Sequence, residues 1–348
     1  MITVQDRIEV AGDRLEQLMQ LFRDAYIDLA ARRGLQFIEF RVSPPVQLLQ
    51  GVNTLWLRWQ VADVGSWWAM RAQSGTAAVS RFWDAVDALC ESRTREYLSE
   101  DTAGVLPQPV DTREWSIATR GHRETAQLSV KDGLTEEQRR TLESLLQEAA
   151  TQLPGLELAS LSANLAPEYA AGHYTWDLLY PDRDTAVQAR RSAPWTTAIC
   201  EALTRFCNTC HALQLDTIAA GVRRPDLAGG IKRTAYFRML PGIPDGKARR
   251  FEQDLLEMPG QIPQILNWRL SRATALPWHT AAGAPWTYVW EQEYEQLDDL
   301  LGPYMAHPHH WGHIDRWFDP ESGVQAVDTE LSHAFCYLDS SILGREIQ

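Results

Sequence analysis

The stretch "IKRTAYFRML", residues 231–240, alternates its side chains as a half-buried β-strand does. One predicted face carries Ile231, Arg233, Ala235, Phe237 and Met239, and the other carries Thr234, Tyr236 and Arg238. The sequence then predicts, in order, an amphipathic helix at 244–258, strands at 265–273 and 286–294, a helix at 295–305 and a closing strand within 324–338. This order of elements is the ferredoxin-like arrangement.

The same order occurs twice more, earlier in the chain. Residues 125–222 repeat it, with a helix at 134–153 that a capping box of Thr135 and Gln138 begins. A more diverged copy occupies residues 3–98, and a period of about 115 residues is typical of repeated domains. We therefore expect an α+β fold, tandem ferredoxin-like repeats forming dimeric α+β barrels. The predicted repeats are 1–106, 113–225 and 230–348, joined by linkers at 100–112 and 223–230.

The number of repeats bears on assembly. A ferredoxin-like sheet has one face covered by its own helices, and its other face needs something to pack on. Two such sheets can close face to face into a barrel with a lumen between them. Three copies cannot all pair within one chain, so the odd one either pairs with another chain or is covered differently. We therefore expect a homodimer.

The composition excludes several classes of partner. The chain has 348 residues, of which 45% are hydrophobic and 23% charged, and its formal net charge is −13. This negative charge argues against nucleic acids and anionic membranes. No stretch approaches the roughly 18 apolar residues of a membrane span, and the N-terminus lacks the pattern of a signal peptide. We expect a cytoplasmic protein that binds a small molecule.

The five cysteines are expected to be reduced thiols, because the chain shows no export signal. One stretch, "CNTCH" at 207–211, matches the C-x-x-C-H pattern of c-type haem attachment. That chemistry belongs to exported proteins, and the flanking residues 196–215 read as an amphipathic helix. On such a helix Cys200, Cys207 and Cys210 approach one face. We interpret them as buried helix cysteines and predict no haem.

Four of the nine histidines lie in "YMAHPHHWGH", residues 304–313. Pro308 suits the first turn of a helix, which would put His313 on one face with His310 or with His309. Either pair offers two metal nitrogens, but a zinc site needs a third or fourth ligand. No complete ligand set is adjacent, so we predict no metal. The structural alternative is that His307 and His310 satisfy backbone groups at a helix start.

Acid–base chemistry needs fewer parts than a metal site. An imidazole with a pKa near ~6.5 stays a base at cellular pH after modest burial, and Tyr304 and His310 are expected to face the barrel lumen. A cation there could hold a carboxylate or stabilise an enolate. The predicted lumen walls are Arg233, Ala235 and Phe237 on the first strand and Trp286, Tyr288 and Trp290 on the third. The alternative is that the tryptophans, 14 in all, form core.

The third repeat resembles the stress-responsive A/B-barrel (Dabb) family of the dimeric α+β barrel superfamily. Members show an aromatic residue and a His-Pro-x-His segment after the second helix and an Asp near the last strand, here Tyr304, His307, Pro308, His310 and Asp328. The resemblance is strongest over 231–340. Polyketide cyclisation, the best-understood activity of the family, implies His310 as general base and Tyr304 as hydrogen-bond donor. Where such a cyclase has two further pocket histidines, this sequence has Arg233 and Tyr288.

The leading hypothesis is a cofactor-independent cyclase, lyase or isomerase acting on a small aromatic or polyketide-like molecule. Its predicted catalytic residues are His310 and Tyr304, and its predicted substrate-binding residues are Arg233, Tyr288, His307, Trp286, Trp290, Phe237 and His313. Two alternatives remain, a cofactor-free monooxygenase of a quinol-type substrate and a ligand-binding or stress-response barrel without catalysis. In the second repeat, His173 and Asp177 on one strand face are a candidate second polar site.

Overall fold

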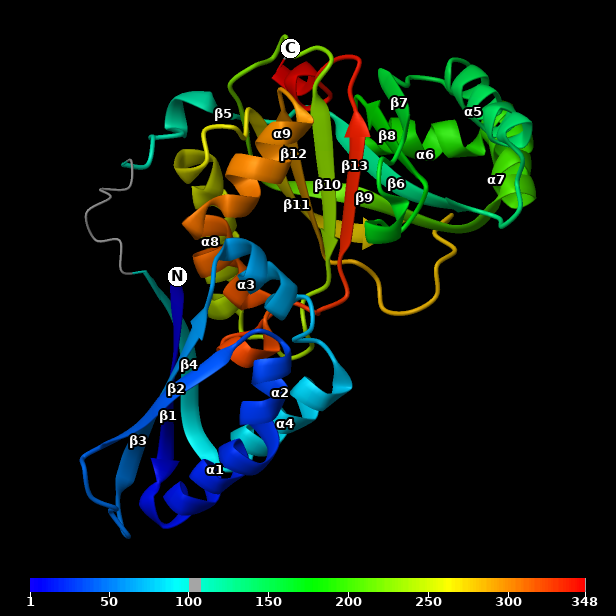
Figure 1. Ribbon diagram of the computed structural model, residues 1–348. Helices are drawn as coiled ribbons and strands as arrows, with labels where there is room; N and C mark the ends of the chain where they lie inside the picture. Colours follow the sequence, from blue (N-terminus) through cyan, green and yellow to red (C-terminus); the bar gives the residue numbers. More distant parts are fainter. Residues whose placement is uncertain (100–107, 348) are drawn as a thin grey trace. The chain divides into compact units, whose positions relative to one another are not determined.

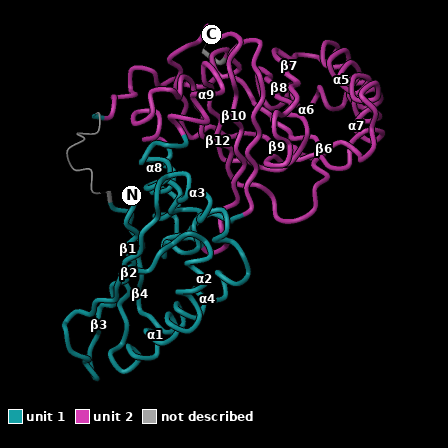
Figure 2. The backbone as a smooth tube through the Cα atoms, in the orientation of Figure 1, with its two compact units in different colours: residues 1–108, 243–255, 305–329 teal, residues 109–242, 256–304, 330–348 magenta. Residues whose placement is uncertain are grey.

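The computed structural model describes residues 1–99 and 108–347, which fall into two compact units (Figures 1 and 2). Unit 1 is Met1–Gln108, Ile243–Leu255 and Met305–Thr329, and unit 2 is Pro109–Gly242, Leu256–Tyr304 and Glu330–Gln348. The third predicted repeat therefore contributes to both units. Residues 100–107 of the first predicted linker lie outside the described residues. In the described parts of the chain, no helix is long and apolar enough to cross a membrane.

Unit 1 is built on a four-stranded antiparallel sheet in the order β2-β3-β1-β4. Its strands are β1 (Ile2–Ala11), β2 (Gln36–Ser43), β3 (Val52–Val61) and β4 (Cys90–Ser99). Its helices from the first repeat are η1 (Gly12–Arg14), α1 (Leu15–Leu21), η2 (Phe22–Tyr26), α2 (Ile27–Arg32), α3 (Val64–Arg71) and α4 (Ala77–Asp87). The third repeat adds short helical turns, η7 (His309–Ile314), η8 (Asp315–Trp317) and η9 (Pro320–Ser322).

The carboxylate of Glu321, on η9, joins the parts of unit 1. It accepts hydrogen bonds from the guanidinium of Arg33 (2.6 Å), the indole nitrogen of Trp83 (2.9 Å) and the hydroxyl of Tyr26, and it lies 3.3 Å from Nη1 of Arg95. Burial opposes the ionisation of Glu321, but Arg95 and Arg33 outweigh it and hold its pKa well below the usual range. This ion cluster fastens a segment of the third repeat into the core of the first.

Unit 2 contains a nine-stranded antiparallel sheet in the order β13-β10-β12-β11-β9-β6-β8-β7, with β5 added beside β9. The strands are β5 (Ser116–Ile117), β6 (His122–Val130), β7 (Leu158–Ala163), β8 (Tyr174–Tyr180), β9 (Cys207–Val222), β10 (Ile231–Phe237), β11 (Asn267–Ala275), β12 (Tyr288–Tyr294) and β13 (Ser332–Tyr337). The amide of Leu165, just after β7, donates to the carbonyl of Phe335 on β13 (2.8 Å). The two ends of the sheet therefore meet, and the second and third repeats form a nearly closed α+β barrel.

The helices of unit 2 follow the ferredoxin-like order in each repeat (Figure 1). Thr135 and Gln138 form the predicted capping box at the start of the first long helix. The helices are η3 (Arg113–Trp115), α5 (Glu136–Ala150), η4 (Pro167–Tyr169), α6 (Arg183–Arg191), η5 (Trp195–Ile199), α7 (Cys200–Phe206), α8 (Asp245–Gln261, shared with unit 1), α9 (Leu297–Asp299), η6 (Leu300–Tyr304) and η10 (Leu343–Ile347).

Buried charges fill one level of the barrel interior. Nζ of Lys232 on β10 lies 2.8 Å from Asp177 on β8 and 2.9 Å from Glu291 on β12. Arg123 on β6 completes the square, 2.8 Å from Glu291 and 3.1 Å from Asp177. Because β10 and β8 are not neighbours in the sheet, these contacts cross the lumen. Burial opposes the charge on Glu291, but Arg123, Lys232 and Arg269 outweigh it and lower its pKa to about 2.

The lumen walls predicted from the strand residues are therefore wrong. The register does put Arg233, Ala235 and Phe237 on one face with Tyr288 and Trp290. That face, however, is the one toward the helices, and the interior receives Lys232, Glu291 and their neighbours. Alternation identifies the residues that share a face but not which face is inside, and paired charges on the inner face imitate a solvent face.

The prediction of a helix across 196–215 is also corrected. Helix α7 ends at Phe206, and "CNTCH" begins strand β9. Cys207 and Cys210 are both buried free thiols in that strand. Residues 213–222 alternate as a strand does and pair with β11, and the pairing of β9 with β6 extends the strand back to Cys207. Tertiary pairing overrides the local helical pattern here.

Lys232 tests the barrel interior. Lys232→Met leaves two buried carboxylates with one cation fewer, which should lower the free energy of unfolding by about 3–5 kcal/mol. Adding Asp177→Asn removes one of the two carboxylates that then share Arg123 and should recover part of the loss. Lys131→Met is the control, because Lys131 donates a single exposed hydrogen bond to Thr204 (2.8 Å). Urea denaturation measures all three; equal midpoints for Lys232→Met and the control would contradict the proposed role.

The sheets of the second and third repeats pair with each other in unit 2, so the sheet of the first repeat is the one for which a partner was predicted. Along β1 every second residue, including Thr3, Gln5 and Arg7, is only partly buried, and Trp56 and Arg58 of β3 lie on the same face. This face mixes arginines with glutamates, so it can complement a second copy of itself across a two-fold axis. We propose that it pairs in a homodimer.

Light scattering should then give about twice the chain mass of 39.5 kDa. Trp56→Glu should shift the protein toward the monomer, because it places a negative charge from each copy at the interface and removes an apolar contact there. Tyr169→Glu, which alters a side chain 63% exposed in unit 2, is the matched control. A wild-type mass of one chain at micromolar concentration would refute the dimer.

Candidate functional site

A buried cation lies on the helix-facing side of the third repeat. The guanidinium of Arg233 on β10 donates to Oε1 of Gln292 on β12 (2.7 Å) and to Nδ1 of His333 on β13 (2.7 Å). Its central carbon lies 5.3 Å from the ring centre of Tyr304, at the end of η6. Arg233 is 4% exposed. Two strands besides its own and one helical turn thus hold the cation in place.

Arg233 fixes the protonation of His333. A guanidinium only donates hydrogen bonds, so Nδ1 of His333 must be the acceptor. The imidazole is therefore neutral and carries its proton on Nε2. In this tautomer His333 is a hydrogen-bond donor and not a base.

Tyr304 covers this cluster. It is 2% exposed, and its ring meets that of Tyr294 at 5.8 Å and 78°. Burial, with Tyr304 as the next contribution, raises the pKa of Tyr294 well above its usual value, so that phenol is neutral. A guanidinium, an imidazole N–H and phenolic hydroxyls are all donors, a set that stabilises negative charge developing on an oxygen atom.

The predicted pocket residues are partly brought together. Phe237, Tyr288 and Trp290 are buried on the same sheet face as Arg233. Trp286 lies elsewhere, at the end of the barrel interior, where its ring is 6.0 Å from that of Tyr236. The strand residues thus share one face as alternation predicted, but that face lies toward the helices. Trp286, which precedes the strand, is the predicted wall residue that lies at the barrel interior.

His307 and His310 belong to unit 1, whereas Tyr304 ends a segment of unit 2. His310 is buried, and its ring centre lies 5.1 Å from that of Trp68. His307 receives hydrogen bonds from the chain that follows it: its carbonyl accepts from the amide of His310 (2.9 Å) and its Nδ1 from that of His309 (3.2 Å). His307 thus satisfies backbone groups at a helix start. The catalytic role of His310 stays a prediction.

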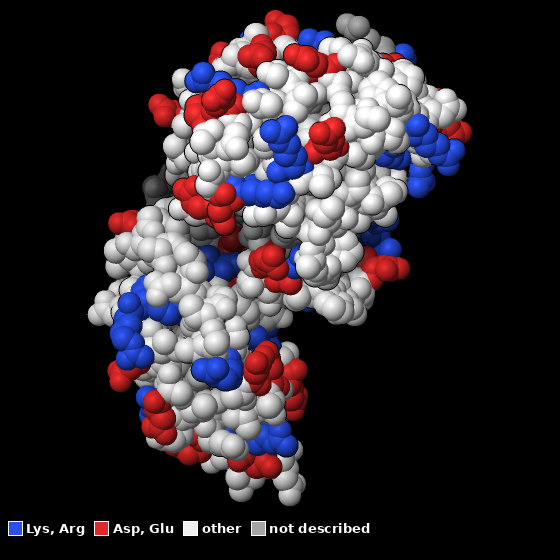
Figure 3. Space-filling model, turned by 90° about the vertical axis from the view of Figure 1, so that its right-hand side faces the viewer, with Lys and Arg blue, Asp and Glu red and all other residues white. Residues whose placement is uncertain are grey.

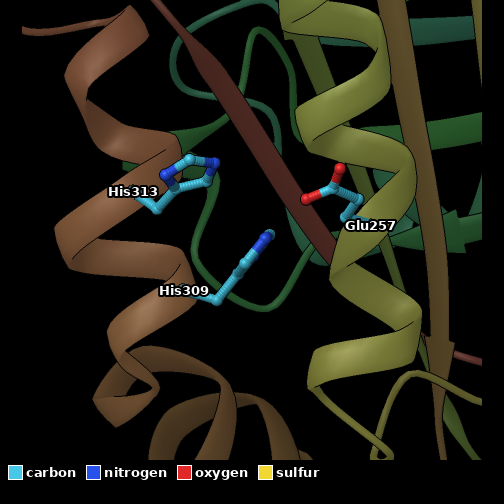
Figure 4. Close-up of side chains that lie close together, drawn as sticks. All are labelled: Glu257, His309 and His313. Carbon is cyan, nitrogen blue, oxygen red and sulfur yellow. The ribbon is translucent and has the colours of Figure 1, made fainter. Parts of the chain in front are cut away.

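Figure 4 shows His309 and His313 side by side on one helical segment. Their ring centres are 5.0 Å apart, which confirms the predicted shared face. Nε2 of His313 lies 3.4 Å from the carboxylate of Asp254, which also accepts from Arg316 (2.7 Å). Glu257, also drawn in Figure 4, lies on the part of α8 that belongs to unit 2. Within unit 1 the two histidines supply two of the three or four ligands of a zinc site.

The candidate polar site of the second repeat separates into two roles. Asp177 belongs to the charged level of the lumen. Nδ1 of His173 accepts a hydrogen bond from the amide of Val130 (3.2 Å), and burial lowers the pKa of His173. His173 therefore contacts the end of β6.

Sequence reasoning missed His333 and Gln292. Both lie on predicted strands, and counting in steps of two from Arg233 across the register would have placed them on its face. For His333 the signal was a titratable residue in a short strand, whereas Gln292 lies between two glutamates and does not stand out in the sequence.

Comparison with known families now adds to the geometry. Residues 231–331 match the model of the Stress responsive A/B Barrel Domain. The match confirms the resemblance of the third repeat, and it includes Arg233, Gln292 and Tyr304 and ends before His333. Among curated proteins, none shows significant similarity to this chain.

Solved structures show only distant likeness. An anthrone oxidase-like protein has 9% identity and a TM-score of 0.46, with 63% of this chain and 91% of that chain covered. A monooxygenase-like structure from Fusobacterium nucleatum has 8% identity and a TM-score of 0.42, covering 64% and 94%. A NIPSNAP family protein from Agrobacterium tumefaciens has 18% identity and a TM-score of 0.25, covering 30% and 99%. These values carry no conclusion about activity.

The histidine segment gives a test by pH. Burial, then His313 and His307, lower the pKa of His309 to about 4 from its ordinary 6.5. Between pH 6.5 and 4 the unfolded chain therefore binds a proton at His309 that the folded chain does not bind. The free energy of unfolding should fall as the pH falls through this window. His309→Asn should remove part of this slope, measured by urea denaturation at pH 7 and pH 5. At pH 8 the ring of His309 is neutral in both the folded and the unfolded chain. Any difference in stability between the wild type and His309→Asn at that pH therefore reports packing alone. An unchanged slope would contradict the depressed pKa.

Proposed function

We propose that the chain is a cofactor-independent enzyme that performs acid–base chemistry, as a cyclase, lyase or isomerase, on a small aromatic or polyketide-like molecule in the cytoplasm. The observation that supports it best is the buried cluster of Arg233, His333 and Tyr304 beneath η6. The aromatic residues Phe237, Tyr288 and Trp290 on the same sheet face suit a planar substrate.

The proposed chemistry begins with removal of a proton next to a carbonyl. The electrons move onto the carbonyl oxygen and form an enolate, which Arg233 stabilises by its charge and Nε2–H of His333 by a hydrogen bond. Gln292 and Nδ1 of His333 hold the guanidinium, so it does not reorient as charge develops. The hydroxyl of Tyr304 is the proposed proton donor.

The base predicted from the sequence is His310, which belongs to unit 1. The tautomer that Arg233 imposes on His333 excludes the latter from that role.

The surface charge is compatible with a small-molecule partner. On the face drawn in Figure 3, lysines and arginines are interspersed with aspartates and glutamates and form no continuous basic stripe. Recognition of a nucleic-acid backbone usually needs such a stripe.

Solvent exchange tests proton abstraction directly. Hydroxylated aryl methyl ketones incubated with the protein in D₂O should gain deuterium at the methyl group, measured by mass spectrometry, without oxygen consumption. Oxygen uptake coupled to loss of a quinol would favour the monooxygenase alternative. Neither exchange nor turnover across a broad panel of such ketones and polyketide-like molecules would overturn the proposal.

Variants then assign the roles. Arg233→Met should lower the exchange rate about 10²–10³-fold, the scale of losing one donor to an oxyanion, whereas Arg140→Met, at an exposed ion pair on α5, should not. His310→Ala should lower kcat by about 10²–10⁴-fold. His309→Ala should have little effect, because the next residue on a helix points about 100° away.

The decrease in kcat for Tyr304→Phe should fall between those for His310→Ala and His309→Ala, since this change removes only the hydroxyl. Thermal melting separates catalysis from structure. If His310 is structural, His310→Ala lowers the free energy of unfolding by roughly 0.5–2 kcal/mol, which a lower Tm reveals. Activity per folded molecule then stays unchanged. Full activity in folded His310→Ala protein would remove His310 from the mechanism.

A further inference from the structure

The connection between β11 and β12 runs back along β9 and brings two histidines together. Within it, the amide of Leu276 donates to the carbonyl of Ala212 (2.9 Å), and that of Thr280 donates to the carbonyl of Cys210 (2.9 Å). His279, between these anchors, meets His211 of β9 with ring centres 5.5 Å apart and planes at 89°. The pair therefore results from backbone hydrogen bonds that fix the loop, and it lies wholly within unit 2.

Trp286 fixes the tautomer of His211. The indole nitrogen of Trp286 donates to Nδ1 of His211 (2.9 Å), and an indole N–H cannot accept. Burial, followed by His279, lowers the pKa of His211 to about 4, so the ring is neutral at neutral pH. Its proton is then on Nε2, which makes that atom a donor. A metal bound at Nε2 would need the proton on Nδ1, where Trp286 already donates, so this arrangement opposes metal binding.

In His279 the two ring nitrogens have the opposite hydrogen-bonding roles. Its Nδ1 lies 3.4 Å from the carbonyl oxygen of Ala212, which can only accept, so Nδ1 carries the proton and Nε2 of the neutral ring is an acceptor. The loop thus sets one imidazole donor beside one imidazole acceptor. A single hydroxyl group has the same two functions, because its oxygen accepts while its hydrogen is donated.

Aromatic and apolar side chains surround this pair. Trp286 is buried, with the guanidinium of Arg238 4.6 Å from its ring centre, and it belongs to an apolar cluster with Leu213 and Tyr236 at the end of the barrel interior. His211 and His279 are only partly buried. Both rings thus keep some exposure beside an aromatic side chain, a setting that favours an aromatic ring over an aliphatic chain.

We propose that His211 and His279 form a second ligand site that binds the hydroxyl group of a phenol. Nε2–H of His211 donates a hydrogen bond to the phenol oxygen, and Nε2 of His279 accepts a hydrogen bond from the phenol hydroxyl. The site lies at the interior end of the barrel, whereas Arg233 lies on the helix-facing side of the sheet. It therefore stands independently of the proposed activity.

Calorimetric titration of the full chain with phenol and with anisole tests the site. Anisole has the same ring but no hydroxyl proton, so phenol should bind and anisole should bind at least roughly tenfold more weakly. His211→Leu and His279→Leu should each weaken phenol binding by a similar factor. His122→Leu, at the start of β6, is the matched control and should leave the affinity unchanged. Arg233→Met should also leave it unchanged, even where it abolishes proton exchange.

Equal affinity for phenol and anisole, unchanged phenol affinity in both leucine variants, or no phenol binding would each overturn the proposal. Should a leucine variant fail to fold, nitrogen-15 NMR of the wild-type histidines decides. Phenol must then shift the imidazole signals of both His211 and His279, and unshifted signals refute the site.

Discussion

The pairing of charges across the barrel of unit 2 is the constraint on which the rest of that unit depends. Lys232, Arg123, Asp177 and Glu291 come from four strands of two repeats, and each lies within 3.1 Å of a partner of opposite sign. Removing such groups from water is costly unless every one is paired. The network therefore fixes the way in which the sheets of the second and third repeats face each other.

This use of the interior moves the candidate chemistry to the other face of the sheet. There the two repeats have diverged. In the second repeat the layer under the helices is filled by Trp176, Trp195 and Trp278, with rings 5.3–6.0 Å apart. In the third repeat the corresponding face carries Arg233 with its polar partners. The helix side of the sheet is thus an aromatic core in the second repeat, whereas in the third repeat it also holds a buried cation.

The sequence predicted the repeats, the order of their elements and the residues that share each face of β10, because hydrophobic alternation and a capping box are local signals. It could not predict which face is inside, since Lys232 and Glu291 are paired only after two distant repeats meet. Nor could it predict that Glu321 enters the core of the first repeat, because its partners Arg33 and Arg95 are more than 200 residues away along the chain. The helix predicted through "CNTCH" failed for the same reason: β6 pairs with that segment and makes it a strand.

Hydrogen-bond direction limits what the histidines of unit 2 can do. Arg233 and Trp286 are both obligate donors, and each donates to Nδ1 of a histidine, His333 in one case and His211 in the other. Both imidazoles are thereby kept neutral with Nε2 protonated, so neither can start a reaction by taking a proton. His279 differs from both, because its Nδ1 faces the backbone carbonyl of Ala212 and its Nε2 is therefore an acceptor. The tautomers, which residue identity alone does not reveal, thus separate the donors from the acceptors among these histidines.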